Sequence, residues 1–97
     1  MGLEVVVPRR DACRLQPVLD ALATAGLPAT IAMVDSTLRA PTAPPPEEWR
    51  DVRLRTPAGM VALARRPDGV AVIVFGNADA VLQDAQRRIA DALRAAP

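Results

Sequence analysis

The chain has 97 residues, of which 51% are hydrophobic, and its 12 basic and 11 acidic residues leave a formal net charge of +1. This length predicts a single domain, 1–97, with enough apolar residues for a modest core. A net charge this small excludes a strong overall field that would attract nucleic acid or an anionic membrane.

The basic residues are all arginine, and the chain contains no lysine, histidine or tyrosine. Without histidine there is no Ser/His or Cys/His nucleophile pair and no imidazole metal ligand, and without lysine there is no Schiff base. We therefore expect a protein that is not an enzyme and that holds no metal or cofactor. The arginine- and alanine-rich composition is typical of a bacterial protein from a GC-rich genome.

The chain also predicts a protein outside the membrane and the secretory route. It has no run of about 18 apolar residues, which a membrane helix needs. Its N-terminus, MGLEVVVPRR, has the apolar run before the charges, the reverse of a secretory signal. A single cysteine, Cys13, forms no internal disulfide, which agrees with a reducing compartment. We expect a cytoplasmic protein.

The first two predicted elements are a strand at 3–7 and a helix that ends at Gly26. LEVVV is short and β-branched, and Pro8 ends it. Helical spacing then recurs in Leu15, Val18, Leu19 and Leu22. Pro17 belongs in the first turn of a helix, so we expect the regular helix to begin near 14–16.

A second strand is predicted at 29–39, with a bend or bulge partway along at 35–37. The proline-rich segment 40–48, APTAPPPEE, follows it. We expect this segment to be a stiff connection within one domain, with Trp49 anchoring its far end. Display of the prolines as a PxxP ligand stays open as an alternative.

Three further strands and a helix complete the chain. The segments WRDVRLR, MVALARR and VAVIVF alternate with the turn sequences TPAG and PDG. The final helix is predicted from about 78 to 95, with Asn77 as its N-cap. Its expected buried stripe consists of Val81, Leu82, Ala85, Ile89, Ala92 and Leu93.

The element order β-α-β-β-β-β-α predicts an α+β fold: an antiparallel sheet of about five strands with two helices on one face. This order resembles the TATA-binding-protein-like fold. The resemblance implies a curved sheet whose underside is used for binding in some members of that fold. It is one of topology, so it carries over no residues and no function.

The two turns decide which side chains share a face of the sheet. An even-residue loop at TPAG and a three-residue loop at PDG place six apolar residues under the helices: Val52, Leu54, Val61, Leu63, Ile73 and Phe75. The opposite face then carries Met60, Ala62, Ala64, Val70, Val72 and Val74, with Arg53 and Arg55 at its rim. Contiguous exposed apolar patches of this kind usually mark an interface. Alternatively, VAVIVF is buried on both sides, with the proline-rich segment as its cover.

Three polar features have structural explanations that involve no catalytic or binding role. Cys13 is expected to be a small, half-buried residue, since no histidine is present to act as its base. Glu47 and Glu48 are adjacent, so their carboxylates diverge on an extended chain and act as solubilising charges. Asp35 and Ser36 suggest a local Asx-type turn.

The leading functional hypothesis is a small cytoplasmic, non-enzymatic binding, adaptor or regulatory domain. It is expected to self-associate as a homodimer, or to bind another protein, through the exposed face or along a sheet edge. One alternative is a nucleic-acid-binding module that uses Arg53, Arg55, Arg65 and Arg66, although the near-neutral charge and two aromatic residues count against it. A second alternative is a small-ligand-binding or enzyme accessory subunit, with a pocket between the helices and the proline-rich segment.

Overall fold

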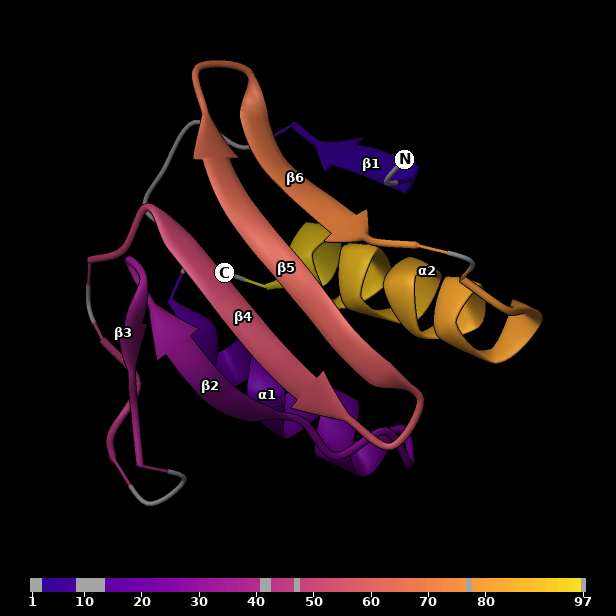
Figure 1. Ribbon diagram of the computed structural model, residues 1–97, viewed down its shortest axis with the longest axis horizontal. Helices are drawn as coiled ribbons and strands as arrows, with labels where there is room; N and C mark the ends of the chain where they lie inside the picture. Colours follow the sequence, from indigo (N-terminus) through magenta and orange to yellow (C-terminus); the bar gives the residue numbers. More distant parts are fainter. Residues whose placement is uncertain (1–2, 9–13, 41–42, 47, 77, 97) are drawn as a thin grey trace.

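The computed structural model describes residues 3–8, 14–40, 43–46, 48–76 and 78–96. They form one antiparallel sheet with two helices on one of its faces (Figure 1). The predicted α+β class is confirmed. The sheet has six strands instead of about five, because one predicted strand is divided in two.

The first strand of the chain lies beside the last one. The strands are β1 (Leu3–Val7), β2 (Thr30–Val34), β3 (Thr37–Leu38), β4 (Asp51–Thr56), β5 (Gly59–Arg66) and β6 (Gly69–Val74), and the helices are α1 (Leu15–Thr24) and α2 (Ala80–Ala95). Across the sheet the order is β1-β6-β5-β4-β2-β3, with every neighbouring pair antiparallel. The two edges are therefore β1 and the two-residue strand β3.

The helix α1 begins and ends where its sequence predicts. It starts at Leu15, so Pro17 lies in the first turn, where its missing N–H removes no helical hydrogen bond. At the other end Gly26 adopts a φ of +82°, and the Leu27 N–H donates to the Leu22 carbonyl over 2.9 Å. This left-handed glycine cap turns the chain back towards β2.

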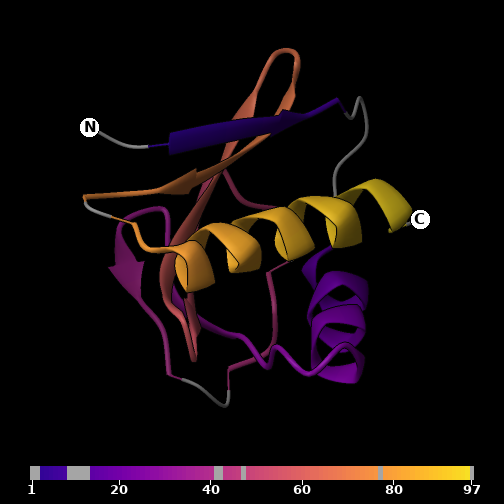
Figure 2. The same ribbon diagram turned by 90° about the vertical axis from the view of Figure 1, so that its right-hand side faces the viewer.

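The helix α2 buries most of the predicted stripe, because Ala85, Ile89 and Leu93 are buried and Leu82 and Ala92 are partly buried against the core. Its N-cap is Asp79, whose carboxylate accepts from the Leu82 N–H at 2.8 Å; Asn77 lies outside the described residues. The buried positions are Ala85, Gln86, Ile89, Ala90 and Leu93. Val81 is exposed, so its predicted place in the core is wrong. The reason is that α2 runs alongside β1 (Figure 2), so the side of the helix next to that strand is covered.

The break between β2 and β3 is a tight turn held by a distant contact. Asp35 and Ser36 have φ values of +48° and +67°. The Asp35 Oδ1 accepts hydrogen bonds from the main-chain N–H groups of Arg50 and Asp51, each at 2.9 Å. The bend predicted here is confirmed, but the carboxylate bonds to the start of β4 and not to a local Asx-type turn. The bonds from Asp51 and then Arg50 lower the pKa of Asp35 below its ordinary 3.8.

The hairpin between β4 and β5 follows the prediction. Thr56 pairs with Gly59, so the loop has two residues, an even number. The Thr56 hydroxyl accepts from the Gly59 N–H at 3.2 Å and donates to the Gly59 carbonyl, which closes the turn. The predicted helix-facing residues of these strands are all fully buried: Val52, Leu54, Val61 and Leu63.

The hairpin between β5 and β6 overturns the predicted placement of the valines. Arg66 pairs with Gly69, so the loop has two residues instead of three, and Leu63 faces Val72 instead of Ile73. A shift of one residue turns every side chain of a strand to the other face. Val70, Val72 and Val74 therefore lie under the helices, with exposed fractions of 2%, 0% and 0%.

The role of Gly69 explains this difference. The predicted three-residue loop treated it as a turn residue, whereas it is the first residue of β6, at a φ of +151°. A Cβ added there would lie 2.1 Å from the Val7 main-chain oxygen. The glycine therefore allows β1 to approach β6 closely, a long-range requirement that a turn pattern does not reveal.

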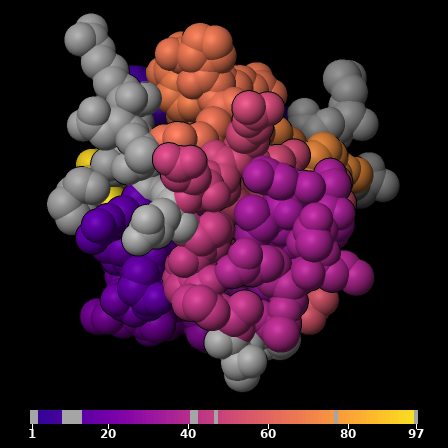
Figure 3. Space-filling view, turned by 90° about the vertical axis from the view of Figure 1, so that its left-hand side faces the viewer, coloured from indigo at the N-terminus to yellow at the C-terminus, as the bar shows by residue number. Residues whose placement is uncertain are grey.

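The proline-rich segment lies on the helix side of the molecule. Pro45 and Pro46 lie beside Leu15 at the start of α1, and Trp49 is buried in the core, which confirms its anchoring role. Figure 3 shows residues 43–46 and 48 at the surface, between α1 and β3. The described part of this segment therefore covers the end of the core and leaves the opposite face of the sheet open.

Candidate functional site

The candidate site is the sheet face turned away from the helices, which we call the outer face. It faces the viewer in Figure 1. The registers place six side chains in one row across all six strands: Leu38, Met33, Arg53, Ala62, Ile73 and Glu4. A neighbouring row holds Thr30, Arg55 and Met60, and Phe75 follows Ile73 by two residues at the same end.

A side-chain bridge covers the part of the outer face near β1. Arg66 on β5 forms an ion pair with Glu4 on β1, so the pair spans β6, the strand between them. On β6 the outward residue below this bridge is Ala71, which is fully buried. A small side chain is needed there because the arginine and the glutamate lie over it.

A second bridge crosses the middle of the outer face. The Arg53 guanidinium carbon lies 6.0 Å from the centroid of the Phe75 ring, at the outer limit of a cation–π contact. Arg53 belongs to β4 and Phe75 follows β6, so the contact spans β5. Ala62 of β5 lies opposite Arg53 and is buried. The alanines of this face thus form the floor below longer side chains.

Large apolar side chains nevertheless stay exposed on the outer face. The exposed fractions are 56% for Phe75, 39% for Met60 and 78% for Leu38. Phe75 and Met60 lie on neighbouring strands and form one exposed apolar pair, whereas Leu38 lies on β3 at the far edge of the sheet. Among the described residues, no carboxylate forms an ion pair with Arg53 or Arg55.

The predicted interface residues are divided between this face and the core. Arg53, Arg55 and Met60 are exposed on the outer face, Ala64 is half-buried there and Ala62 is buried. The three valines of β6 belong to the core, as described above. Prediction from sequence missed Phe75 and Ile73 because it assigned both to the opposite face. The predicted and the observed register of β6 differ in whether the loop at PDG has three residues or two.

The four arginines predicted to contact nucleic acid do not share one surface. Arg53 and Arg55 lie on the outer face without an acidic partner, and Arg66 lies there paired with Glu4. Arg65 pairs across the sheet with the buried Val70, and its guanidinium carbon lies 5.4 Å from the Trp49 ring centroid. Two of the four therefore remain on the outer face without an ion pair.

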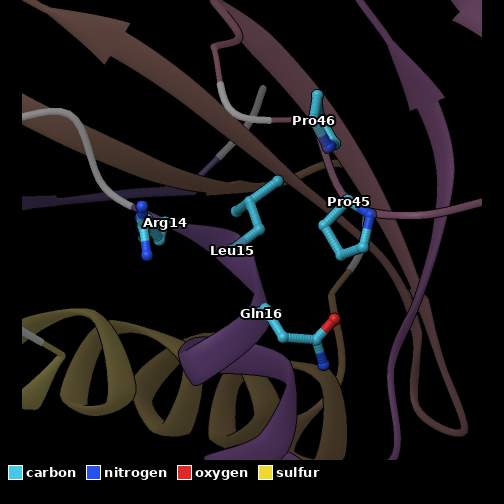
Figure 4. Close-up of a pocket in the computed structure, with 5 residues that line it drawn as sticks. All are labelled: Arg14, Leu15, Gln16, Pro45 and Pro46. Atoms are coloured by element: carbon cyan, nitrogen blue, oxygen red, sulfur yellow. The ribbon is translucent and has the colours of Figure 1, made fainter.

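The pocket predicted beside the proline-rich segment is small. Figure 4 shows it between the start of α1 and two prolines, lined by Arg14, Leu15, Gln16, Pro45 and Pro46. Its volume of about 200 Å³ lies below the range of about 300 to 1,000 Å³ typical of ligand sites. A separate hollow of about 490 Å³ beside Trp49 is lined mainly by charged residues: Asp35, Glu48, Arg50 and Arg65. Neither hollow is a deep apolar pocket.

The remaining predicted features are the single cysteine, the adjacent glutamates, and the expected absence of a metal site and of a membrane helix. Cys13 and Glu47 lie outside the described residues. Within the described residues, no three side chains of the kinds that bind metals are gathered together. None of the helices described is long and apolar enough to cross a membrane.

Comparisons with protein-family models, curated proteins and solved structures found no match to this chain. The resemblance to the TATA-binding-protein-like fold therefore remains one of element order.

Proposed function

We propose that the chain is a small, non-enzymatic binding domain of an adaptor or regulatory kind, whose outer face docks a protein segment with carboxylates beside apolar side chains. The observation that carries this proposal is the exposed Phe75 ring next to Met60, in the same two rows as Arg53 and Arg55. Aromatic residues, methionine and arginine are enriched in the centres of protein interfaces.

The chemistry of the partner follows from the unpaired arginines. A guanidinium group binds a carboxylate through two parallel hydrogen bonds, and this geometry gives specificity as well as affinity. Arg53 already lies over Phe75, which orients its side chain along the face. A partner that places a carboxylate near Arg55 and an apolar side chain on Phe75 and Met60 would engage both kinds of group.

A second copy is a poor partner for this face. Two copies stacked face to face would bring together Arg53 and Arg55 from each, while Glu4 is already paired with Arg66. Among the described residues of the face, Asp51 is the acidic side chain without such a pair. Burying charged groups without partners is unfavourable by several kcal/mol each by rough estimate. Because the valines lie in the core, the face also lacks the apolar patch that self-association through it would have used.

Single-stranded nucleic acid is the second candidate, because an exposed ring beside an arginine is a base-stacking arrangement. Two unpaired arginines would neutralise about two phosphates, giving a slope of log K against log salt near −1.4. Tight binders make about 6–10 phosphate contacts. The electrostatic contribution on this face is therefore too small for ordinary nucleic-acid affinity.

The proposal is tested by selection from a displayed library of random peptides, followed by anisotropy measurements on the selected peptides. We expect peptides with Asp or Glu next to an apolar residue. The double variant Arg53→Glu, Arg55→Glu and the variant Phe75→Ser should each weaken binding about tenfold or more. The matched control is Val81→Ser, which removes a similarly exposed apolar side chain from α2 and should leave binding unchanged.

Two results would overturn the proposal. One is a set of selected peptides whose affinity is the same for the Phe75→Ser variant as for the unmodified chain. The other is binding to a mixed oligonucleotide pool that Arg53→Ala, Arg55→Ala abolishes, together with no peptide binding, which would assign the face to nucleic acid.

A further inference from the structure

The side chains at the centre of the outer face form two columns with β5 between them. Arg53 of β4, Ala62 of β5 and Ile73 of β6 lie at one level, because each pairs with the next across the sheet. Two residues further along, Arg55 continues the first column and Phe75 the second. Neighbouring strands lie about 4.8 Å apart, so the arginine column and the apolar column are about 10 Å apart.

The outer face offers a partner side chains but no main-chain hydrogen bonds. The central strand β5 is paired with β4 on one side and with β6 on the other, so the ladders use its N–H and C=O groups. An extended segment lying flat on the face would leave its own main-chain groups without protein partners. An α-helix satisfies these groups internally. The face therefore favours a helix over an extended strand.

We propose that the docked segment is an amphipathic α-helix that lies along β5, with carboxylates over Arg53 and Arg55 and apolar side chains over Ile73 and Phe75. This inference rests on the proposed function and specifies the form of its partner. A helix is about 10–12 Å wide with its side chains, which matches the distance between the two columns.

The spacing along the strands sets the sequence pattern of the helix. Arg53 and Arg55 are two residues apart, about 6.8 Å along β4. Four helix residues rise about 6.0 Å, so carboxylates at positions i and i+4 reach the two arginines. Neighbouring helix residues point about 100° apart, so the residue before or after each carboxylate, according to the direction of the helix, lies over β6. The expected pattern is an acidic and an apolar residue side by side, repeated four residues later.

The third member of the β4 column limits this pattern to two carboxylates. Asp51 lies two residues before Arg53 and points to the same face. Among the described residues, no arginine forms an ion pair with it. Like charges brought together at an interface are unfavourable. The helix position over Asp51 should therefore be basic or neutral, and the complement of the column is one such residue followed by two acidic ones.

In the free chain, the Arg53 side chain crosses the place where the helix would lie. Its guanidinium carbon is 6.0 Å from the centroid of the Phe75 ring, at the outer limit of a cation–π contact. A carboxylate above β4 binds the guanidinium through two charge-assisted hydrogen bonds, which are stronger than this contact. Arg53 therefore turns towards the carboxylate when the helix binds, and the ring becomes accessible to an apolar side chain.

The test compares helix-forming peptides of about 18 residues, a length at which isolated helices become measurable. The first peptide has two glutamate–leucine pairs four residues apart. The second has the same composition, with its glutamates two residues apart. Such glutamates share a face in an extended strand but point about 160° apart in a helix. Fluorescence anisotropy should show binding of the first peptide that is tighter by about tenfold or more. The first peptide with a central proline, which breaks a helix, should bind as weakly as the second.

Charge exchange checks the alignment of the helix. Arg53→Glu should weaken binding of the first peptide, and exchange of one of its two glutamates for arginine should restore part of the affinity. Arg55→Glu should be rescued in the same way only by the other glutamate. The matched control is Val81→Ser on α2, which should leave binding unchanged. Circular dichroism checks that each variant is folded.

The outcomes separate this inference from the proposed function. Tighter binding of the second peptide, or equal binding of the proline peptide, would overturn the helix and leave the proposed function standing. The same holds if no designed peptide binds while peptides selected from the library do. Binding that weakens as the protein concentration rises would place a second copy on the face instead. If the selected peptides also fail to bind, the proposed function itself is wrong.

Discussion

Replacing Val72 and Phe75 by alanine, one at a time, tests the register of β6. Val72 is fully buried under the helices, whereas Phe75 is 56% exposed on the outer face. Val72→Ala removes the equivalent of two buried methylene groups, about 1.6 kcal/mol, and the cavity that remains brings the loss to about 2 kcal/mol. Phe75→Ala removes a half-exposed ring and a weak contact with Arg53, so we expect a loss of about 1 kcal/mol or less.

The assay is thermal and urea unfolding of both variants beside the unmodified chain. For a domain of this size about 1 kcal/mol corresponds to a Tm shift of about 4–8 °C. We expect Val72→Ala to lower the Tm by about 10 °C and Phe75→Ala by about half of that or less. The opposite order would refute the reasoning, because a three-residue loop would bury Phe75 and expose Val72.

Three further predictions concern contacts that hold the sheet together. Gly69→Ala should lower the free energy of unfolding by about 3 kcal/mol, since its Cβ would meet the Val7 oxygen. Gly76→Ala, with open space around it, should lower that free energy by only about 1 kcal/mol. Equal losses in urea unfolding would contradict this. Asp35→Asn should lower the free energy of unfolding at neutral pH. The difference in that free energy between the variant and the unmodified chain should disappear as the pH falls through the lowered pKa of the carboxyl, below 3.8. A difference that stays constant down to about pH 2 would count against the two main-chain bonds. Gln86→Leu should lower stability by about 1–2 kcal/mol and speed amide exchange in β1, and unchanged exchange there would argue against the bond to that strand.

The elements with local signals were predictable from the sequence. The β-branched run LEVVV, the proline in the first turn of α1 and the TPAG turn each specify their structure through neighbouring residues. The α+β class follows from the order of these elements. The even number of residues in the loop between β4 and β5 could also be inferred, because an odd number would mix arginine and valine on both faces of the sheet.

The errors arise where a distant segment decides the local structure. Gly69 is glycine because β1 approaches β6 there, and this close approach is not visible in the PDG turn sequence. Asp35 ends β2 by binding the start of β4, fifteen residues away. Gln86 is polar yet buried, because its amide satisfies two strand carbonyls that only the tertiary structure brings together.

The candidate site was therefore predicted in part. Arg53, Arg55 and Met60 depend on the β4–β5 register, which the sequence predicts, and they lie on the outer face. Phe75 depends on the β5–β6 register and was assigned to the core. The exposed ring that gives the outer face its central contact could be recognised only once the position of Gly69 was known.

Mapping of a bound peptide by amide chemical shifts tests the central claim most directly. A peptide with an acidic and an apolar residue, selected by display on this chain, is titrated into the isotope-labelled protein. We expect the largest shift changes in β4, in β5 and at Phe75, and we expect them to vanish in the Phe75→Ser variant. Shift changes confined to α1, α2 and the proline-rich segment would contradict it, because the outer face would then not be the binding surface.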